Sequence, residues 1–569
     1  MKQCCVALVS LIVFASALRC DALDREAFTI SKYDLGVRID PAQQRLGVRG
    51  KLTLRNDSAM SQKAVALQIS SSLHWLSIRA GGKPLQFVAQ NYNSDIDHSG
   101  ALSEAIVDLP AAVPARNSID LEIGYEGTIP LDASRLTRMG TPDEAARSTD
   151  WDQIGPQFTA VRGAGNVAWY PIITEGASLA QGNDLFDVLN RWKARETSAT
   201  MQLHFAVANE EQDDKPELIV NASACPLTHQ SQEEFVADCD YQSLGAAVPT
   251  FVIANYTTAV RDDIAVHFLS GHDEYAAIFA DAAVKASPLI SEWFGNPRGK
   301  VQIVDLASRE GSPFESGSML LIPLSGADAE AAGLIAAHQL THAAFSSPRP
   351  WINEGLAHFA QVLYLEQEKG RQVALEYLQS HQYALTSRES RKLPGLAEDD
   401  SLITTSDDQF IRSKSLCVWW MLREMAGDQA LKKALASYRP EQDKDPSYMQ
   451  KLIETQAHRD FEWFFDDWVY RDRGLPDFKI ESAFTRKMLP EGYMTTITVS
   501  NRGGAGAEVP IFVKSAGEVT TKRLVVLRHG SAVIRVETLQ SPDEIVVNDG
   551  SVPENDMTNN AFRVIPATK

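Results

Sequence analysis

Hydrophobic and polar residues alternate along most of the first 260 residues, a pattern that is typical of half-buried β-strands. The clearest alternating runs lie at residues 33–39, 51–54 and 119–123. Polar stretches near residues 130–155 and 208–216 indicate loops between strands. We therefore predict an antiparallel β domain over residues 23–262.

The spacing of the hydrophobic residues becomes helical in the middle of the chain, over residues 273–468. Strand-like runs interrupt it at residues 301–306 and 318–323. One helix is predicted to begin after a capping Asp328 and to reach Phe345, and the next is predicted to end at Gly370. These elements predict a mainly helical domain over residues 263–475.

The alternation returns after Pro476 in five short runs, at residues 494–499, 509–513, 524–527, 532–536 and 544–547. Several short strands within about 90 residues are typical of a small β-sandwich. The predicted order along the chain is therefore β, then α, then β, with the sandwich over residues 476–569.

The first residues predict a signal peptide at residues 1–22. Lys2 precedes an uncharged run at residues 6–18, and Ala15-Ser16-Ala17 provides an A-x-A cleavage pattern. A membrane anchor is the alternative, but this run is shorter than the about 20 residues that a spanning helix needs. No later run is long and apolar enough to span a bilayer, so we expect an exported protein, periplasmic or extracellular.

Composition limits the partners more than the fold. The chain has 569 residues, of which 44% are hydrophobic and 22% charged, so each folding unit can build a core. Its 54 basic and 74 acidic side chains give a net charge of -20. This charge repels phosphate backbones and disfavours nucleic acid as a partner, while the oligomeric state stays open.

Three cysteines lie beyond the signal region. In an oxidising compartment Cys225 and Cys239 can form a disulfide across neighbouring strands, or they can remain unbridged thiols in a core. The sequence leaves both alternatives open. Cys417 lies in an apolar, helical context and is predicted to be a core residue.

Two histidines and a glutamate in the helical region are spaced as the ligands of a zinc ion. His338 and His342 are four residues apart on a predicted helix, so their imidazoles point the same way. Glu354 lies on the inward stripe of the next helix, and two histidines with one glutamate form the His₂Glu donor set of catalytic zinc. Histidines satisfied by hydrogen bonds within a core are the alternative.

The sequence resembles the aminopeptidase N-like zinc peptidases of the gluzincin clan. The resemblance is carried by Trp351–Ala357 (Trp-Ile-Asn-Glu-Gly-Leu-Ala), by Lys414 and the helix after it, and by residues 464–468 and 474–476. It extends over almost the whole mature chain. It implies an N-terminal β-saddle domain, a thermolysin-like helical catalytic domain and a C-terminal β-sandwich. It also implies one zinc ion per chain and a peptide or protein substrate.

The metal-binding segment departs from the family pattern in two ways. The family has H-E-x-x-H with about eighteen residues before the third ligand. Here eleven residues, Ala343 to Asn353, intervene, and Gln339 replaces the glutamate. That glutamate normally takes a proton from zinc-bound water, which an amide cannot do. Gln339 therefore occupies a catalytic position without the catalytic group.

Two more family features are altered in this sequence. The substrate-binding Gly-Ala-Met-Glu-Asn strand resembles Gly317-Ser318-Met319-Leu320-Leu321, where Leu320 replaces the glutamate that binds the substrate's amino group. We expect Glu315 nearby to be an exposed loop carboxylate. Arg412 occupies the place of the oxyanion-stabilising tyrosine, and its guanidinium can still stabilise developing negative charge.

Two functions are consistent with these residues. The first is a zinc metallopeptidase whose hydrolysis is weak because the general base is missing, a loss of about 10²–10⁴ in rate. The second is a catalytically inactive pseudo-peptidase that serves as a peptide- or protein-binding scaffold. The sequence does not name the substrate, nor decide between cleavage at a chain end and internal cleavage.

Overall fold

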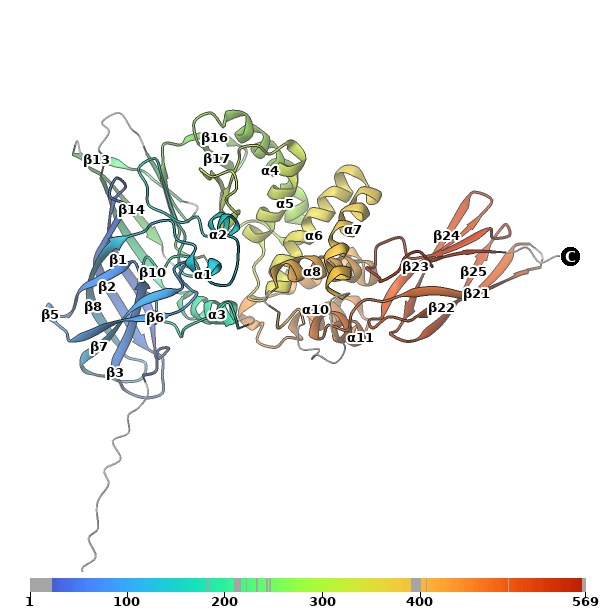
Figure 1. Cartoon of the computed structure of the whole chain (residues 1–569), viewed down its shortest axis with the longest axis horizontal. Helices are drawn as coiled ribbons and strands as arrows, with labels where there is room; N and C mark the ends of the chain where they lie inside the picture. Colours follow the sequence, from blue (N-terminus) through green and yellow to red (C-terminus); the bar gives the residue numbers. More distant parts are fainter. Residues whose placement is uncertain are drawn as a thin grey trace, which may run out of the picture.

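A computed structural model describes residues 23–181, 184–208, 216–221, 223–231, 234–241, 244, 247–389, 401–405, 407–489 and 491–564. The predicted signal peptide lies outside the described residues. The molecule is elongated, with a β-rich N-terminal part, a helical middle and a β-rich C-terminal part in a row (Figure 1). Among the described helices, none combines the length and the apolar character that a bilayer-spanning segment requires.

The N-terminal part is built from three sheets. The largest has the order β13-β14-β10-β1-β2-β8-β4-β5, and the two smaller ones are β3-β7-β6 and β12-β11-β15-β9. The strands are β1 (Phe28–Asp40), β2 (Arg45–Asn56), β3 (Gln62–Ser70), β4 (Leu73–Ala80), β5 (Lys83–Pro84), β6 (Phe87–Asn93), β7 (Ala101–Val113), β8 (Ser118–Thr128), β9 (Phe158–Val161), β10 (Thr200–Ala208), β11 (Glu217–Val220), β12 (Ser223–Cys225), β13 (Thr228–Ser231), β14 (Glu234–Tyr241) and β15 (Phe251–Ala254).

The alternation in the sequence is reproduced in the burial of these strands. In β1, Tyr33, Leu35, Val37 and Ile39 are buried while the residues between them are more exposed. This strand also departs from a purely antiparallel arrangement, because β1 and β10 pair in parallel. A disulfide joins Cys225 and Cys239, which decides between the two alternatives left by the sequence.

Three helices in the N-terminal part were not expected from the sequence. The predicted loop at residues 130–155 contains α1 (Ser134–Thr137) and α2 (Asp143–Thr149), which are too short to show a helical period. The longer α3 (Asp184–Glu196) buries Leu185, Val188 and Trp192 at helical spacing. The sequence pattern predicts strands on both sides of this helix, so α3 differs from the predicted all-β domain.

The middle part combines a five-stranded sheet with a helical layer. The sheet has the order β16-β17-β18-β20-β19, and β17, β18 and β20 run parallel. The first strand of this sheet, β16, ends directly before residue 262. The strands are β16 (Thr257–Arg261), β17 (Ile264–Phe268), β18 (Val301–Asp305), β19 (Phe314–Ser316) and β20 (Met319–Ile322).

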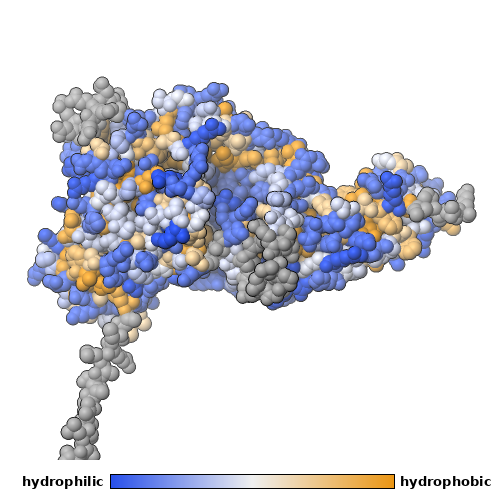
Figure 2. All heavy atoms as spheres, viewed as in Figure 1, coloured by the Kyte–Doolittle hydropathy of each residue, from blue (hydrophilic) through white to orange (hydrophobic). Residues whose placement is uncertain are grey.

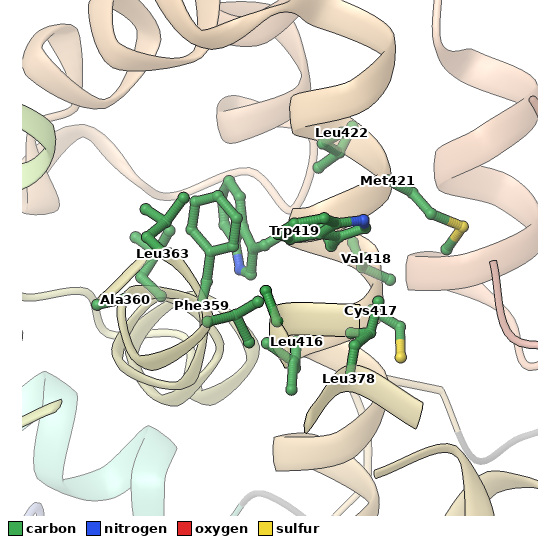
Figure 3. Packing of buried hydrophobic residues seen from close by; sticks show 14 of the residues in the cluster. Phe359, Ala360, Leu363, Leu378, Leu416, Cys417, Val418, Trp419, Met421 and Leu422 are labelled. Carbon is green, nitrogen blue, oxygen red and sulfur yellow. The ribbon is translucent and has the colours of Figure 1, made fainter. Parts of the chain in front are cut away.

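The helices of the middle part pack tightly around large aromatic side chains. They are α4 (Asp273–Phe294), α5 (Ala329–Ala344), α6 (Pro350–Lys369), α7 (Arg371–Glu389), α8 (Asp408–Ala426), α9 (Asp428–Ser437), α10 (Tyr448–Ala457) and α11 (Glu462–Phe465), with single turns at Pro440–Gln442 and Asp466–Tyr470. Figure 3 shows Trp419 of α8 packed toward Phe359, Ala360 and Leu363 of α6. Cys417 is fully buried on α8, which confirms the prediction.

The C-terminal part consists of two small sheets, β21-β22-β25 and β24-β23-β26-β27. Its strands are β21 (Phe478–Lys487), β22 (Tyr493–Asn501), β23 (Ala507–Ser515), β24 (Glu518–Val526), β25 (Ser531–Thr538), β26 (Glu544–Val547) and β27 (Ala561–Arg563). Four of the five predicted runs fall within strands, and the run at residues 524–527 extends one residue beyond the end of β24. One continuous hydrophobic cluster runs from Ile264 to Val552, so the helices and these sheets share a core.

Candidate metal centre

Helix α5 begins as the sequence predicts. The side chain of Asp328 accepts hydrogen bonds from the backbone N–H groups of Glu330 and Ala331, which caps the helix. Alanine and glycine along α5 allow the neighbouring helices to approach closely. At Gly333, an added Cβ would lie 2.7 Å from the ring of Tyr364 on α6, so this crossing requires glycine. The helix that carries both histidines is therefore held close to α6.

The short connection to α6 is fixed by side chains at both ends. Pro350 occupies the first turn of α6, where a missing N–H costs nothing. Asn353 accepts a hydrogen bond from the backbone N–H of Ser347, and Arg349 donates to Asp443 at 2.7 Å. From the N-terminal part, Asn190 of α3 donates to the carbonyl of Pro348. The connection is shorter than in the family pattern, but it is well anchored.

The three predicted ligands converge. The Nε2 atoms of His338 and His342 are 3.2 Å apart, and they lie 3.8 Å and 3.5 Å from the nearest carboxylate oxygens of Glu354. A tetrahedral zinc ion with bonds of about 2.0–2.1 Å places neighbouring donors about 3.3–3.4 Å apart. In the described part of the chain, these residues form the only group of three or more such side chains with mutual donor distances within 4.8 Å. The donor set and its spacing fit zinc.

The protonation of His338 also suits a metal. Burial holds the pKa of His338 well below its usual range, and the charge of the neighbouring His342 lowers it further. The ring is then neutral at physiological pH, and a nitrogen lone pair is available to a cation. The side chains of His338 and Glu354 keep 14% and 26% of their surface exposed, so the group is open to solvent on one side.

The second nitrogen of His342 has a polar neighbour. Its Nδ1 lies 3.1 Å from the side-chain amide of Asn353. Coordination through Nε2 leaves the ring proton on Nδ1, so a bound metal requires the amide to present its oxygen there. Turning the amide about its Cβ–Cγ bond does this, at the expense of the hydrogen bond from Ser347. A ring proton on His342 Nδ1 and the hydrogen bond from Ser347 would therefore compete for the oxygen of Asn353.

Gln339 lies on the same helix, between the two histidines. It is 4% exposed, and its Oε1 atom has no hydrogen-bond partner among the described residues. An unsatisfied buried acceptor costs about 1–3 kcal/mol. Such an atom beside three metal donors fits a site that holds a further hydrogen-bond donor, such as a metal-bound water.

Helix α8 approaches the ligands from the side of α6. At the crossing, a Cβ on Gly355 would lie 2.6 Å from the Cβ of Ser415, and the indole of Trp419 donates to the carbonyl of Trp351. The contact of Gly355 with Ser415 and the hydrogen bond from Arg423 to Glu366 advance together along both helices, so α6 and α8 run parallel. One turn before Ser415, Arg412 comes close to His358 and His338, whose pKa values it helps to lower.

The guanidinium of Arg412 is held by its own helix. Asp408, one turn earlier, accepts a hydrogen bond from its Nε at 2.9 Å. Asp408, Arg412, Ser415 and Trp419 follow one another at steps of four, three and four, so they share the face of α8 that meets α6. Arg412 therefore stands beside the metal group with its position restrained.

The predicted substrate-binding strand is corrected by the structure. Gly317 and Ser318 form the two-residue turn of a hairpin, and Gly317 has a φ of 61°. Met319 and Leu320 are fully buried in β20, which is paired on one side with β18 and on the other with β19. Their side chains are closed to a substrate, and their backbone groups are already used.

The edge of this sheet is β19, and it carries Glu315. Glu315 pairs directly with Leu320, so both side chains lie on the same face of the sheet. Leu320 belongs to the core cluster that includes Ala336 and Leu340 of α5, so this is the face that meets the histidine-bearing helix. Glu315 is partly buried rather than an exposed loop residue.

Sequence reasoning assigned Glu315 no binding role and did not consider Lys193 of α3. Burial lowers the pKa of Lys193, and the charge of Glu315 acts against this shift. The two-residue Gly-Ser turn between apolar runs is a hairpin signal and could have identified β19. Nothing local in the sequence places α3 beside it.

Comparison with solved structures shows an M1 peptidase-like fold. An M1 zinc metallopeptidase from Deinococcus radiodurans, and a mutant of it bound to a Tyr-Ser-Ala substrate, each match with a TM-score of 0.52. The matches cover 78% of this chain and 94% of the other, at 16% and 15% sequence identity. No protein-family pattern and no curated protein matches the sequence. The likeness is therefore one of fold.

Proposed function

We propose that the chain is a zinc-binding metallopeptidase that acts on peptides and hydrolyses them slowly. The convergence of His338, His342 and Glu354 on one point carries this proposal. When bound there, zinc would supply Lewis-acid chemistry and lower the pKa of a bound water toward about 7. The structure neighbours, which are zinc metallopeptidases, support the same reading.

The edge strand β19 is the proposed substrate platform. An extended peptide can pair with a free strand edge through main-chain hydrogen bonds. Glu315 on this strand would bind the substrate's free amino group, the role that the sequence had assigned to the position of Leu320. Lys193 lies close enough to compete for the same carboxylate, which would weaken the preference for a free amino terminus.

Arg412 is the proposed stabiliser of negative charge on the substrate. A guanidinium that is fixed in place before the reaction needs little reorganisation when charge develops. The hydrogen bond from Arg412 to Asp408 contributes to this, but it is a weak restraint because both side chains of the pair are exposed. Gln339 would hold a water without removing its proton, so the rate is expected to be low.

A binding scaffold is the second candidate. The amide at Gln339 favours it, because the described site lacks a carboxylate at the position of the usual base. We further propose a three-domain layout with boundaries near residues 262 and 475, one zinc ion per chain, and export to the periplasm or the extracellular space. Export is consistent with the disulfide between Cys225 and Cys239.

A metal analysis combined with a peptide-library digest tests the proposal. Purified protein, loaded with zinc and dialysed, is expected to retain one zinc ion per chain and to cleave peptides slowly. His342→Ala is the matched control and is expected to lose both properties. Retained zinc without cleavage would establish the scaffold. Wild-type protein without stoichiometric zinc would refute the proposed function.

A further inference from the structure

A third imidazole stands next to the metal group. His358 is one turn after Glu354 on α6, so both side chains leave the helix on the same face. Its ring centroid is 4.8 Å from that of His338, in an edge-to-face arrangement, and the residue is only 8% exposed.

The neighbours of His358 determine which ring nitrogen carries the proton. The amide nitrogen of Gln361 donates to the carbonyl of Leu334 at 3.2 Å, so its oxygen faces the other way. That oxygen lies 2.9 Å from Nδ1 of His358 and also accepts a hydrogen bond from Tyr377 at 3.1 Å. An oxygen can only accept, so Nδ1 must be the donor.

The other nitrogen, Nε2, therefore carries a lone pair. A neutral imidazole carries one proton, and the neighbours of His358 place it on Nδ1. Nε2 is buried and has no hydrogen-bond partner among the described residues. Oε1 of Gln339 is in the same condition. Two buried acceptors without donors thus flank His338, one next to it in the chain and one packed against its ring.

Direct binding of His358 to the metal does not explain this arrangement. The group of donor atoms within 4.8 Å of one another contains His338, His342 and Glu354 but excludes His358. An acceptor that is too far to be a ligand can still reach the ion through one water molecule. A water in the fourth position of a His₂Glu zinc site has two O–H groups to donate.

We infer that His358 Nε2 and Gln339 Oε1 both accept hydrogen bonds from the water in the metal's open position. The inference rests on the proposed zinc site and adds a positioning residue to it. Outer partners of this kind orient the metal's surroundings, and their loss commonly costs about 10–100-fold in metal affinity. It also gives both buried acceptors a partner.

The test compares zinc affinities by competition with a chromophoric chelator. His358→Leu removes the acceptor and is expected to weaken zinc binding about 10–100-fold. His358→Gln keeps an acceptor oxygen and is expected to stay close to wild type. The metal-free leucine variant is expected to melt no lower than metal-free wild type, because the unsatisfied atom is gone. His358→Phe keeps a ring without an acceptor and replaces the leucine variant if that one does not fold.

His381 is the matched control, since its ring lies 5.8 Å from that of His358 on the side of Tyr377. His381→Leu is expected to leave zinc affinity unchanged. Equal zinc affinity in wild type and His358→Leu would overturn the inference while leaving the zinc site intact, and would make Arg412 the better donor for Nε2. Equal losses in the leucine and glutamine variants would reduce His358 to a packing role. Absence of zinc from wild type would instead refute the proposed function together with this inference.

Discussion

The two walls of the metal site are built in different ways. The metal wall, α5 and α6, takes all three donors from 17 consecutive residues, and caps, small residues and a tight connection fix its geometry. The proposed substrate wall would be assembled from β19, α8 and α3, which lie far apart in the chain. Charged groups such as Glu315, Arg412 and Lys193 define it. Metal binding and substrate handling can therefore change independently.

Figure 2 shows the surface hollowed between the N-terminal part and the helical middle, with mainly hydrophilic residues around the hollow. The contact of α3 with the α5–α6 connection lies between these same two parts. A change in the packing of the N-terminal part against the helical middle would therefore affect the substrate wall more than the metal wall.

The largest effect is expected from breaking the metal wall. His342→Ala and Glu354→Ala each remove one of three donors, so the zinc loss should exceed the about 10–100-fold that an outer partner contributes. Inductively coupled plasma mass spectrometry after dialysis measures it. Circular dichroism is the control, because α5 and α6 are packed into the large shared core and should remain folded. Retention of stoichiometric zinc in either variant would mean that the metal is held elsewhere.

Gln339→Glu restores the general base and tests whether its absence limits the rate of peptide hydrolysis. Glutamate is nearly isosteric with glutamine, so Gln339→Glu should fit the same buried space. At matched zinc occupancy we expect peptide hydrolysis to rise about 10²-fold or more. Initial rates on a fluorogenic peptide measure it. An unchanged rate with zinc bound would shift the defect to the substrate wall, first to Arg412.

A smaller effect is expected on the substrate wall itself. Glu315→Gln should lower kcat/KM for peptides with a free amino terminus about 10-fold, since a charge-assisted hydrogen bond is lost. Acetylated peptides should be unaffected, and zinc affinity should not change. Lys193→Met removes the cation that competes for Glu315, and it should increase the preference for peptides with a free amino terminus. Equal losses on free and acetylated peptides would contradict a role in binding the amine.

The smallest effect on the metal site is expected from a substitution of Glu196 in the core of the N-terminal part, which should change the pH dependence of stability instead. Glu196 accepts a hydrogen bond from Tyr33, and burial raises its pKa to about 8. An unfolded chain releases this proton near pH 4.3, so the free energy of unfolding falls as the pH rises from about 4.3 to about 8. Glu196→Gln removes that loss, so calorimetry should show a melting temperature above wild type at pH 8 and equal to it at pH 4. Zinc affinity should be the same at both pH values.

The elements of the metal wall could be predicted from the sequence because each depends on residues that are close together in the chain. The cap at Asp328, the i,i+4 histidines and the helix end at Gly370 each depend on a few neighbouring residues, and all are found where expected. Gln339 was likewise identified by its position alone. Its unsatisfied oxygen could not be predicted, since that depends on which side chains surround it.

The substrate wall could not be predicted because strand order is a property of the whole fold. Leu320 matched a family motif by its neighbours in the chain, yet β20 is an inner strand and β19 is the edge. A three-residue strand such as β19 is also too short to show an alternating pattern. The helix α3 was lost in the same way, within a long region of strands.

The close contact at Gly355 couples the position of α6, which carries a metal donor, to the position of α8, which carries Arg412. Glu354, the third donor, precedes this glycine, and Ser415, which touches it, is one turn from Arg412. A single methyl group at residue 355 would push the two helices apart and displace the carboxylate and the guanidinium together. Side chains around the site are free to diversify, but the spacing between α6 and α8 is not. Evolution or design can therefore rewrite the chemistry of this site one side chain at a time, provided that residue 355 stays a glycine.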